Sequence, residues 1–257
     1  MAIAQLPSIQ LLPGKKVYFA SDFHLGMPSA AVSLQREKLI CEWLKFAATD
    51  AQHIFLLGDI FDAWLEYKHV VPKGFTRLLG TLAQLRDAGI AITVFTGNHD
   101  LWMYGYFEQE FDIKVLHHEV RLDINDTKFL LAHGDGLGPG DRSYKMLKGF
   151  LNNRITKWAY RWLHPDLGIP MAQWFSQRGA YKKSEEEVFH GEKEYLIQYC
   201  HGILEQQQVA HFIFGHRHYM LQHQLSNTST YTNLGDWLQY NSYAQFDGQA
   251  LLLKTYK

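Results

Sequence analysis

Short apolar runs alternate with longer amphipathic stretches along the first hundred residues. The runs at 17–21, 53–57 and 90–96 have the length and the β-branched or aromatic content of buried strands. The stretches between them, 30–48 and 74–88, carry apolar residues at helical spacing. Such alternation predicts a largely parallel sheet that is flanked by helices.

Hairpins are predicted further along the chain. The apolar runs 120–124 and 127–132 are separated only by Asn125-Asp126, a pair of residues that favours a tight turn. Asp247-Gly248 is a stronger signal of the same kind among the short strands of the C-terminal tail. The second half of the chain therefore adds antiparallel strands to the fold.

A long segment without strand patterning interrupts the second half. Residues 141–206 have a helical pattern, and strand character returns at 211–214. The predicted fold class is α/β, a β-sandwich flanked by helices with a helical insertion that forms a cap. The expected core comprises 1–140 and 207–257, and the expected insertion is 141–206.

Composition and charge narrow the class of protein. The chain has 257 residues, a formal net charge of −1, and two widely separated cysteines, Cys41 and Cys200. Such a charge does not indicate binding to nucleic acid, and two cysteines favour a reducing compartment over a disulfide framework. We find no pattern of a signal peptide and no apolar run of the ~20 residues that a transmembrane helix needs. A cytoplasmic protein that meets a membrane only at its surface is expected.

The chain contains 14 histidines, and several of them lie in short polar motifs that directly follow apolar runs. Each motif alone is common in turns, but five in succession at strand ends are specific. Ligands of α/β sheets bind outside the carboxyl ends of the strands, so the five motifs are predicted to converge on one site. The motifs are Asp22-Phe23-His24, Gly58-Asp59-Ile60-Phe61-Asp62, Gly97-Asn98-His99-Asp100, His133-Gly134-Asp135 and Gly215-His216-Arg217-His218.

The residue types in these motifs indicate a centre with two metal ions. In an extended Asp22-x-His24 or His216-x-His218, residues two apart point the same way, so each pair can face one pocket. Imidazoles and carboxylates bind divalent transition metals, and one carboxylate can bridge two ions. Two ions ~3.5–4 Å apart can activate water and clamp a phosphate.

With these motifs in this order, the sequence resembles the calcineurin-like metallophosphoesterases. The resemblance implies that Asp59 bridges the two ions and that Asp62 orients His99, which acts on the phosphate. It implies manganese as the metal, although the same ligands would accept iron or zinc. By the same resemblance, the first ion is held by Asp22, His24, Asp59 and His218, and the second by Asp59, Asn98, His133 and His216.

Within that superfamily the chain is most similar to the UDP-2,3-diacylglucosamine hydrolases of lipid A synthesis. Trp64 follows the bridging-aspartate motif as in that family, and 133–137 leads on to Asp141 and Tyr144. The chain also carries Leu-Gly-Asp-Trp at 234–237, which matches a family motif. It departs from the best-known members by having His99 where they carry arginine, which places it in a divergent branch.

The stretch 142–183 is basic and aromatic. It holds nine Lys or Arg residues, one acidic residue and eight aromatic residues. One interpretation is a basic amphipathic helix that packs on the core. The other is a cap that holds acyl chains and touches an anionic bilayer. Apolar residues recur at three- and four-residue steps and predict one helical face, made of Tyr144, Leu147, Leu151, Ile155, Trp158 and Trp162.

The resemblance implies hydrolysis of the phosphoanhydride of UDP-2,3-diacylglucosamine to UMP and 2,3-diacylglucosamine 1-phosphate. The alternatives are a metal-dependent phosphodiesterase or phosphatase of another phosphoester, and a non-catalytic scaffold, which would have lost metal ligands. Expected partners are the glycolipid substrate and the inner face of an anionic inner membrane, without nucleic acid or an obligate protein partner. The expected substrate contacts are Trp64, Asp135, Asp141, Tyr144, Arg154, Trp158 and Lys183.

Overall fold

The computed structural model describes residues 3–140, 142–183 and 189–257, with only the backbone described at 143 and 177–183. Two six-stranded sheets face each other in the orders β1-β6-β7-β8-β10-β9 and β12-β11-β2-β3-β4-β5. The first sheet contains β1 (Ala4–Gln5), β6 (Val120–Ile124), β7 (Thr127–Leu131), β8 (His211–Phe214), β9 (Met220–Ser226) and β10 (Ser229–Leu234). The second contains β2 (Lys16–Ala20), β3 (Ala51–Leu57), β4 (Ala91–Phe95), β5 (Lys114–Leu116), β11 (Ser242–Phe246) and β12 (Leu251–Thr255).

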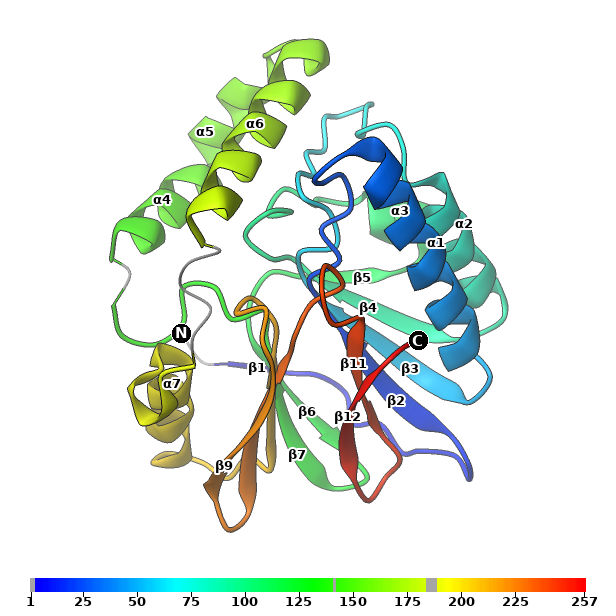
Figure 1. Cartoon of the computed structure of the whole chain (residues 1–257), viewed down its shortest axis with the longest axis vertical. Coiled ribbons are helices and arrows are strands. Elements are labelled where there is room, and N and C mark those ends of the chain that lie inside the picture. The colour runs from blue at the N-terminus through cyan, green and yellow to red at the C-terminus, as the bar shows by residue number, and fades with distance from the viewer. Residues whose placement is uncertain (1–2, 141, 184–188) are drawn as a thin grey trace.

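Helices cover the outer faces of the sandwich (Figure 1). Three of them, α1 (Ala30–Ala47), α2 (Thr76–Asp87) and α3 (Tyr106–Phe111), flank the second sheet. A 3-10 turn, η1 (Gly191–Lys193), leads into α7 (Tyr195–Leu204), which packs on the first sheet. The predicted β-sandwich with flanking helices is confirmed, and so are the hairpins β6–β7 and β11–β12.

Alternation along the strands divides the core into layers. Phe55 and Leu57 of β3 point between the two sheets, while Ile54 and Leu56 point toward α1 and α2. The period of two puts an apolar side chain on each face, which is why this run is almost entirely apolar. Burial on both faces holds β3 rigidly in the middle of its sheet, and the Gly58-Asp59 motif starts where that strand ends.

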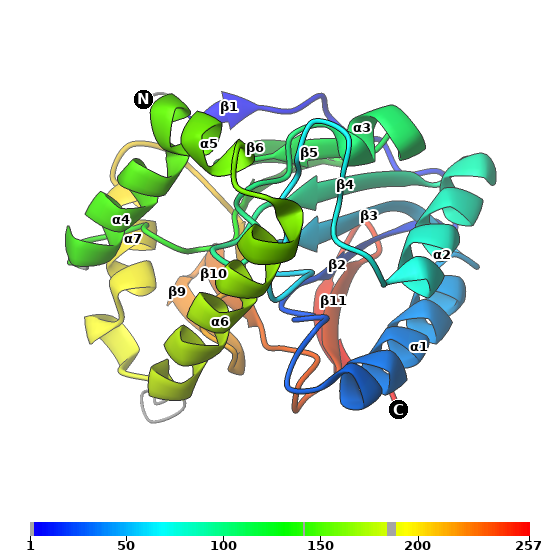
Figure 2. The same cartoon turned by 90° about the horizontal axis from the view of Figure 1, so that it is seen from above.

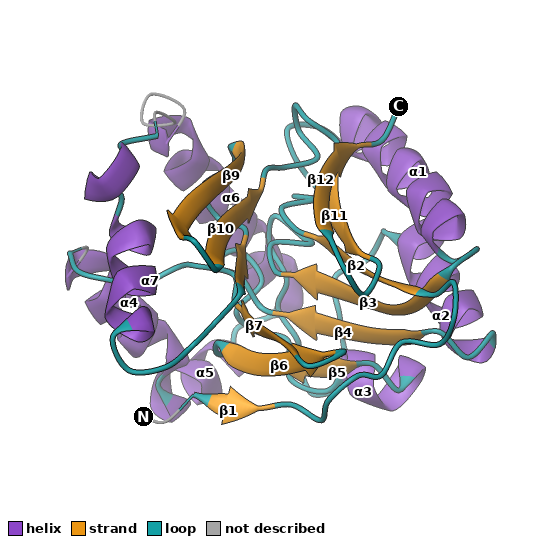
Figure 3. Ribbon diagram, turned by 90° about the horizontal axis from the view of Figure 1, so that it is seen from below, coloured by secondary structure: helices purple, strands orange, loops and turns teal. Residues whose placement is uncertain are grey.

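Strand direction brings the polar motifs together. In the second sheet β2, β3 and β4 run parallel, so their carboxyl ends share one edge. In the first sheet β7, β8 and β10 run parallel to one another in the same way. Seen from below, the two sheets lie next to each other with β2, β3 and β4 running side by side (Figure 3). Each predicted motif follows one of these parallel strands.

Three helices of the predicted insertion, α4 (Arg142–Asn152), α5 (Arg154–Arg161) and α6 (Pro165–Lys183), rise above the sandwich (Figure 1). The continuous helical face predicted over Tyr144–Trp162 is wrong, because α4 ends at Asn152 and Asn153 caps α5. The Asn153 side chain accepts a hydrogen bond from the backbone N–H of Ile155 at 2.8 Å, which is typical of a helix start. The division into core and insertion at 141 and 206 stays a prediction. One helix of the predicted insertion, α7, packs on the first sheet.

Among the residues described, no helix is both long and apolar enough to cross a membrane.

Candidate dinuclear metal centre

The motifs that were predicted to bind metal turn sharply where their strands end. We expected extended Asp22-x-His24 and His216-x-His218 segments, but all four residues have left-handed backbones, with φ of 57°, 44°, 69° and 57°. Asp59 shares this conformation with φ of 52°. Non-glycine residues rarely adopt it, and such strain is concentrated at functional sites. The side chains of each pair still converge, but by a turning backbone and not by the strand's alternation.

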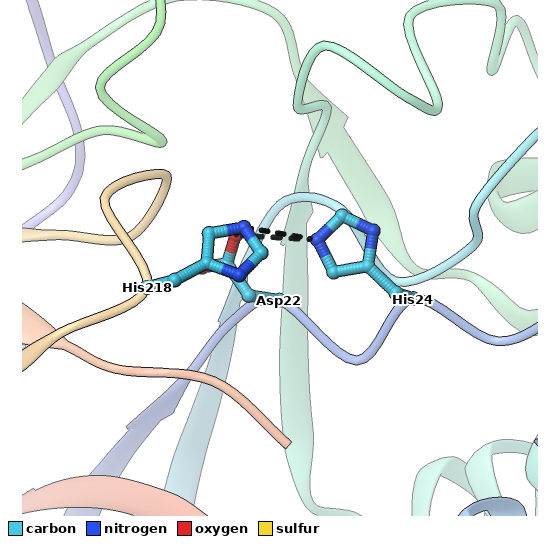
Figure 4. Close-up of side chains that lie close together, drawn as sticks. All are labelled: Asp22, His24 and His218. Carbon is cyan, nitrogen blue, oxygen red and sulfur yellow. Dashed lines mark hydrogen bonds and ion pairs between the residues drawn. The ribbon is translucent and has the colours of Figure 1, made fainter. Parts of the chain in front are cut away.

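The first candidate ligand group comprises Asp22, His24 and His218 (Figure 4). The Nε2 atoms of His24 and His218 lie 3.2 Å apart. Oδ1 of Asp22 lies 3.7 Å from Nε2 of His24 and 3.4 Å from Nε2 of His218. All three side chains thus direct a ligand atom to one point, as a bound cation would require.

The second group comprises Asp59, His133 and His216, with Asn98 beside them. Oδ2 of Asp59 lies 3.2 Å from Nε2 of His133, and Oδ1 of Asn98 lies 3.3 Å from the same nitrogen. The structure therefore brings together every residue that the sequence assigned to the second ion. Asp59 also faces the first group, since its Oδ2 lies 3.7 Å from Nε2 of His24, and these two residues form a third candidate group with His99.

Glycine is required where backbone and carboxylate meet at this centre. A Cβ atom at Gly97 would lie 2.2 Å from Oδ1 of Asp59, and one at Gly215 would lie 2.4 Å from Oδ2 of Asp22. Both distances are far below van der Waals contact, and the atoms concerned belong to side chains held in place. Any larger residue at either position would displace a ligand.

In two of the candidate ligand histidines, His133 and His218, the Nδ1 nitrogen is hydrogen-bonded to another group of the protein. Nδ1 of His133 donates to the carbonyl of Leu57 at 2.8 Å, and Nδ1 of His218 donates to Oδ2 of Asp236 at 3.2 Å. Such contacts fix the tautomer and leave Nε2 for the metal. In the sequence, Asp236 stands out only as part of the Leu-Gly-Asp-Trp motif at 234–237. The strand–Gly-Asp pattern after β10 is a signal that could have identified it as an orienting residue.

Asp100 holds the loop that carries the shared carboxylate. It is fully buried, and its two oxygens accept hydrogen bonds from the backbone N–H groups of Ile60 at 2.8 Å and Gly97 at 2.6 Å. Burial, and then the nearby Asp59 carboxylate, raises the pKa of Asp100 to about 6. Asp100 thus links the loops after β3 and β4 directly behind the metal ligands.

His99 and Asp62 meet as predicted, with an addition. Nδ1 of His99 lies 3.3 Å from Oδ1 of Asp62 and 3.1 Å from the Asp62 carbonyl. The hydroxyl of Ser176, on α6, lies 2.5 Å from the same nitrogen and donates to Oδ1 of Asp62 at 2.9 Å. The sequence pattern did not point to Ser176, because nothing local marks one serine of an exposed helix.

The charges of the centre fit divalent cations. Burial alone would lower the pKa of His24 and His133. Asp22, Asp62 and Asp59 raise the pKa of His24 to about 10, and Asp59, Asp22 and Asp135 raise that of His133 to about 10. Buried carboxylates that hold protons on imidazoles will equally attract metal ions, which displace those protons. Nitrogen and carboxylate oxygen are also the donor atoms that divalent transition metals prefer. The residues present therefore fit two divalent ions.

The insertion is attached to the centre through Asp135. This buried carboxylate accepts a hydrogen bond from the Tyr144 hydroxyl at 2.5 Å and pairs with the Lys148 ammonium at 2.6 Å. Asp135 and Lys148 also line a pocket next to His133, together with His117. Asp135 thus lines this pocket, and its contacts with Tyr144 and Lys148 join α4 to the core.

Other predicted substrate contacts are placed differently. Trp64 is only 1% exposed, stacks on Phe61 and donates its indole N–H to Glu66 at 3.0 Å, so it is a core residue and not a substrate contact. Arg154 and Trp158 are exposed on α5. Asp141 lies outside the described residues, and of Lys183 only the backbone, at the end of α6, is described.

The fold and the paired ligand groups define a class of protein, and comparison with known families agrees. The model of the calcineurin-like phosphoesterase family matches residues 15–220, and the chain belongs to that family. Members of this family bind divalent metals and hydrolyse phosphoric esters or anhydrides, so the protein is a metal-dependent hydrolase.

Curated relatives carry a more specific name. The chain is 35% identical to the UDP-2,3-diacylglucosamine hydrolase of Porphyromonas gingivalis over 93% of its own length and 97% of that protein. It is 25% identical to the hydrolase of the same name from Shewanella piezotolerans, over 88% of this chain and 92% of that one. A third relative so named, from Histophilus somni, is 25% identical over 87% of this chain and 92% of its own.

Proposed function

We propose that this chain hydrolyses the phosphoanhydride of UDP-2,3-diacylglucosamine to UMP and 2,3-diacylglucosamine 1-phosphate. One observation carries the proposal: two groups of residues that could each hold a metal ion, with Asp59 facing both, lie beneath an insertion that exposes large apolar side chains. The name of the relative that is 35% identical over nearly all of its length supports the same substrate. The proposed metal ligands are Asp22, His24, Asp59, Asn98, His133, His216 and His218.

The insertion offers a surface for acyl chains. Trp158 is 62% exposed, Trp162 is 77% exposed and Trp174 is 48% exposed. A soluble protein that exposes so many large apolar groups on one subdomain uses them to bind something apolar. The apolar side chains exposed on the three helices and at the C-cap of α5 are Met146, Leu147, Phe150, Ile155, Trp158, Trp162, Leu167, Met171, Trp174 and Phe175.

The chain's own residues prepare the reaction. Two divalent ions, when bound, would lower the pKa of an attacking water and neutralise charge on the phosphoryl oxygens. Asp59, tied by its Oδ1 to the backbone N–H of His99 at 2.8 Å, keeps the two ligand groups at a constant separation. The strained backbones at Asp22 and His216 hold the ligand atoms in position before substrate arrives.

His99 is the proposed catalytic side chain, and Asp62 orients it. Its Nδ1 faces Asp62 and Ser176, which leaves Nε2 as the nitrogen that can face the phosphate. The ring lies against His24 with the centroids 4.8 Å apart, next to the first ligand group. From that position a protonated His99 can stabilise charge on a phosphoryl oxygen and protonate the leaving group.

Manganese is the proposed metal, as the resemblance to the UDP-2,3-diacylglucosamine hydrolases implies, and the same ligand set would also accept iron or zinc. We propose further that the protein works in the cytoplasm at an anionic membrane face. The stretch 142–183 has nine basic residues against one acidic residue, and its exposed tryptophans suit the interface of a bilayer.

The test is the identity of the products. Purified protein with manganese is incubated with UDP-2,3-diacylglucosamine in water labelled with oxygen-18. The expected products are UMP and 2,3-diacylglucosamine 1-phosphate, with one labelled oxygen on whichever phosphorus is attacked. Release of UDP would contradict anhydride hydrolysis, and an intact substrate beside rapid cleavage of a phosphomonoester would favour a phosphatase.

A further inference from the structure

One side chain of the insertion enters the catalytic centre. Asp62 and His99 lie in loops after β3 and β4, whereas Ser176 lies on α6, 77 positions further along the chain than His99. Seen from above, α6 passes over the region where these strands end (Figure 2). The Ser176 hydroxyl lies between the two, 2.5 Å from Nδ1 of His99 and 2.9 Å from Oδ1 of Asp62.

The direction of these hydrogen bonds follows from proton counting. Asp62 is a buried carboxylate, and a carboxylate offers hydrogen-bond acceptors only. The single hydroxyl proton of Ser176 is donated to Asp62. The serine oxygen must then accept from His99, whose Nδ1 carries a proton, and Nε2 is left to face the substrate.

The helix that carries Ser176 is docked on the loop that carries His99. Ala172, one turn before Ser176, packs in a cluster with Leu101 and Trp102. The indole of Trp102 donates to the carbonyl of Leu151 at 3.2 Å, and its ring contacts Tyr160 edge-on at 4.7 Å. The insertion is therefore fixed to residues that directly follow His99, and a shift of α6 would move the serine out of register with the imidazole.

We propose that Ser176 is a positioning residue that couples the docking of the insertion to the orientation of His99. When α6 is docked, the serine completes the link from His99 to Asp62 and holds the ring. When α6 moves away, the ring retains only the longer contacts to Asp62, at 3.1 and 3.3 Å. The inference rests on the proposed catalytic role of His99.

Ser176→Ala tests the coupling, with bis(p-nitrophenyl) phosphate and manganese as the assay and metal content and circular dichroism as checks. Loss of one oriented hydrogen bond should lower kcat roughly threefold to tenfold, with KM and metal content unchanged. Ser176→Thr keeps the hydroxyl and should retain most of kcat. Gln173→Ala, an exposed position on the same helix, is the matched control and should behave as the parent.

A double-mutant cycle separates positioning from other roles. In a His99→Ala background, Ser176→Ala should cause no further loss of kcat, because the ring that it positions is gone. A further loss of equal size, or a raised KM with kcat unchanged, would overturn the inference and make Ser176 a substrate contact. Unchanged kcat in Ser176→Ala would overturn the inference alone. Unchanged kcat in His99→Ala would overturn the proposed role of His99 and this inference with it.

Discussion

The Oδ2 oxygen of Asp59 lies 3.2 Å from the Nε2 nitrogen of His133. The same oxygen lies 3.7 Å from Nε2 of His24, a member of the other ligand group. Because Asp59 is the proposed ligand of both ions, Asp59→Ala should remove a ligand from each of them and reduce activity to background. Metal analysis of the purified variant should find at least one ion lost. Full activity with normal metal content would contradict a shared carboxylate.

His99 is predicted to act on the transition state and not to hold metal. His99→Ala should lower kcat by ~10²–10⁴-fold, the usual contribution of general acid–base catalysis, while metal content stays normal. Asp62→Asn should have a smaller effect of the same kind, because Asp62 only orients the ring. The His99 ring lies close to His24 and Asp59, so it could also reach a metal ion. Loss of metal from the His99→Ala variant would show that His99 is a metal ligand.

Asp236 should matter through His218. Its carboxylate accepts from Nδ1 of His218, while its other oxygen accepts from the backbone N–H of Gln239 at 2.8 Å and so is held in place. Removal of such an orienting group typically costs ~10–100-fold in metal affinity or activity. Asp236→Asn should therefore bind manganese more weakly in a titration, and excess manganese should restore part of the activity. If affinity for the metal is unchanged, the contact has no orienting role.

The pH dependence of metal binding follows from the raised pKa values of His24 and His133, both about 10 in the metal-free fold against an ordinary value of 6.5. These groups stabilise the metal-free fold fully below about pH 6.5 and lose that contribution as the pH rises through about 10. An imidazole that binds a metal ion does not carry this extra proton. The stability of the metal-loaded protein should therefore not fall in this way as the pH rises.

The difference in Tm between manganese-loaded and chelator-treated protein should accordingly widen from pH 7 to pH 10. Unfolding followed by circular dichroism in buffers across this range would measure it. A difference that stays constant or narrows would mean that these histidines do not bind protons in the metal-free state.

The sheets were predictable because their signals are local. The run containing Phe55 and Leu57 is apolar on both faces, and the polar motifs begin where such runs end. The arrangement of parallel strands then brings the motifs together without further information. The convergence of the motifs could be predicted from residue type and position, whereas the assignment of ligands to each ion came from the family resemblance and stays a prediction.

The remainder of the site depends on contacts between distant positions. Ser176 meets Asp62 across 114 residues, and no pattern near Ser176 marks this contact. Trp64 follows a motif that suggested a substrate contact, but the packing of Phe61 and Phe107 around it places it in the core. Asp22 and His24 have left-handed backbones because the chain turns sharply after β2. The alternation of residues along a strand gives no sign of such a turn.

The exposed aromatic residues of the insertion should control selectivity for acyl chains. Trp158→Ala or Trp174→Ala should lower kcat/KM for UDP-2,3-diacylglucosamine and narrow its advantage over the deacylated form, since a large apolar side chain contributes ~1.5–3 kcal/mol when buried. Cleavage of bis(p-nitrophenyl) phosphate should not change. Phe46→Ala, at an exposed aromatic position on α1, is the control. An equal loss of kcat/KM with the diacyl substrate and with bis(p-nitrophenyl) phosphate would show that these tryptophans support the fold and do not bind acyl chains.

The most direct test of the proposed function compares kcat/KM for UDP-2,3-diacylglucosamine and for deacylated UDP-glucosamine in the parent protein with manganese. Each methylene that enters an apolar site contributes ~0.8 kcal/mol, so two that bind are sufficient for about a tenfold preference. We predict that the diacyl substrate is favoured by well over tenfold. Comparable values for the two substrates would contradict the lipid assignment, and a phosphodiesterase of soluble nucleotides would then take its place.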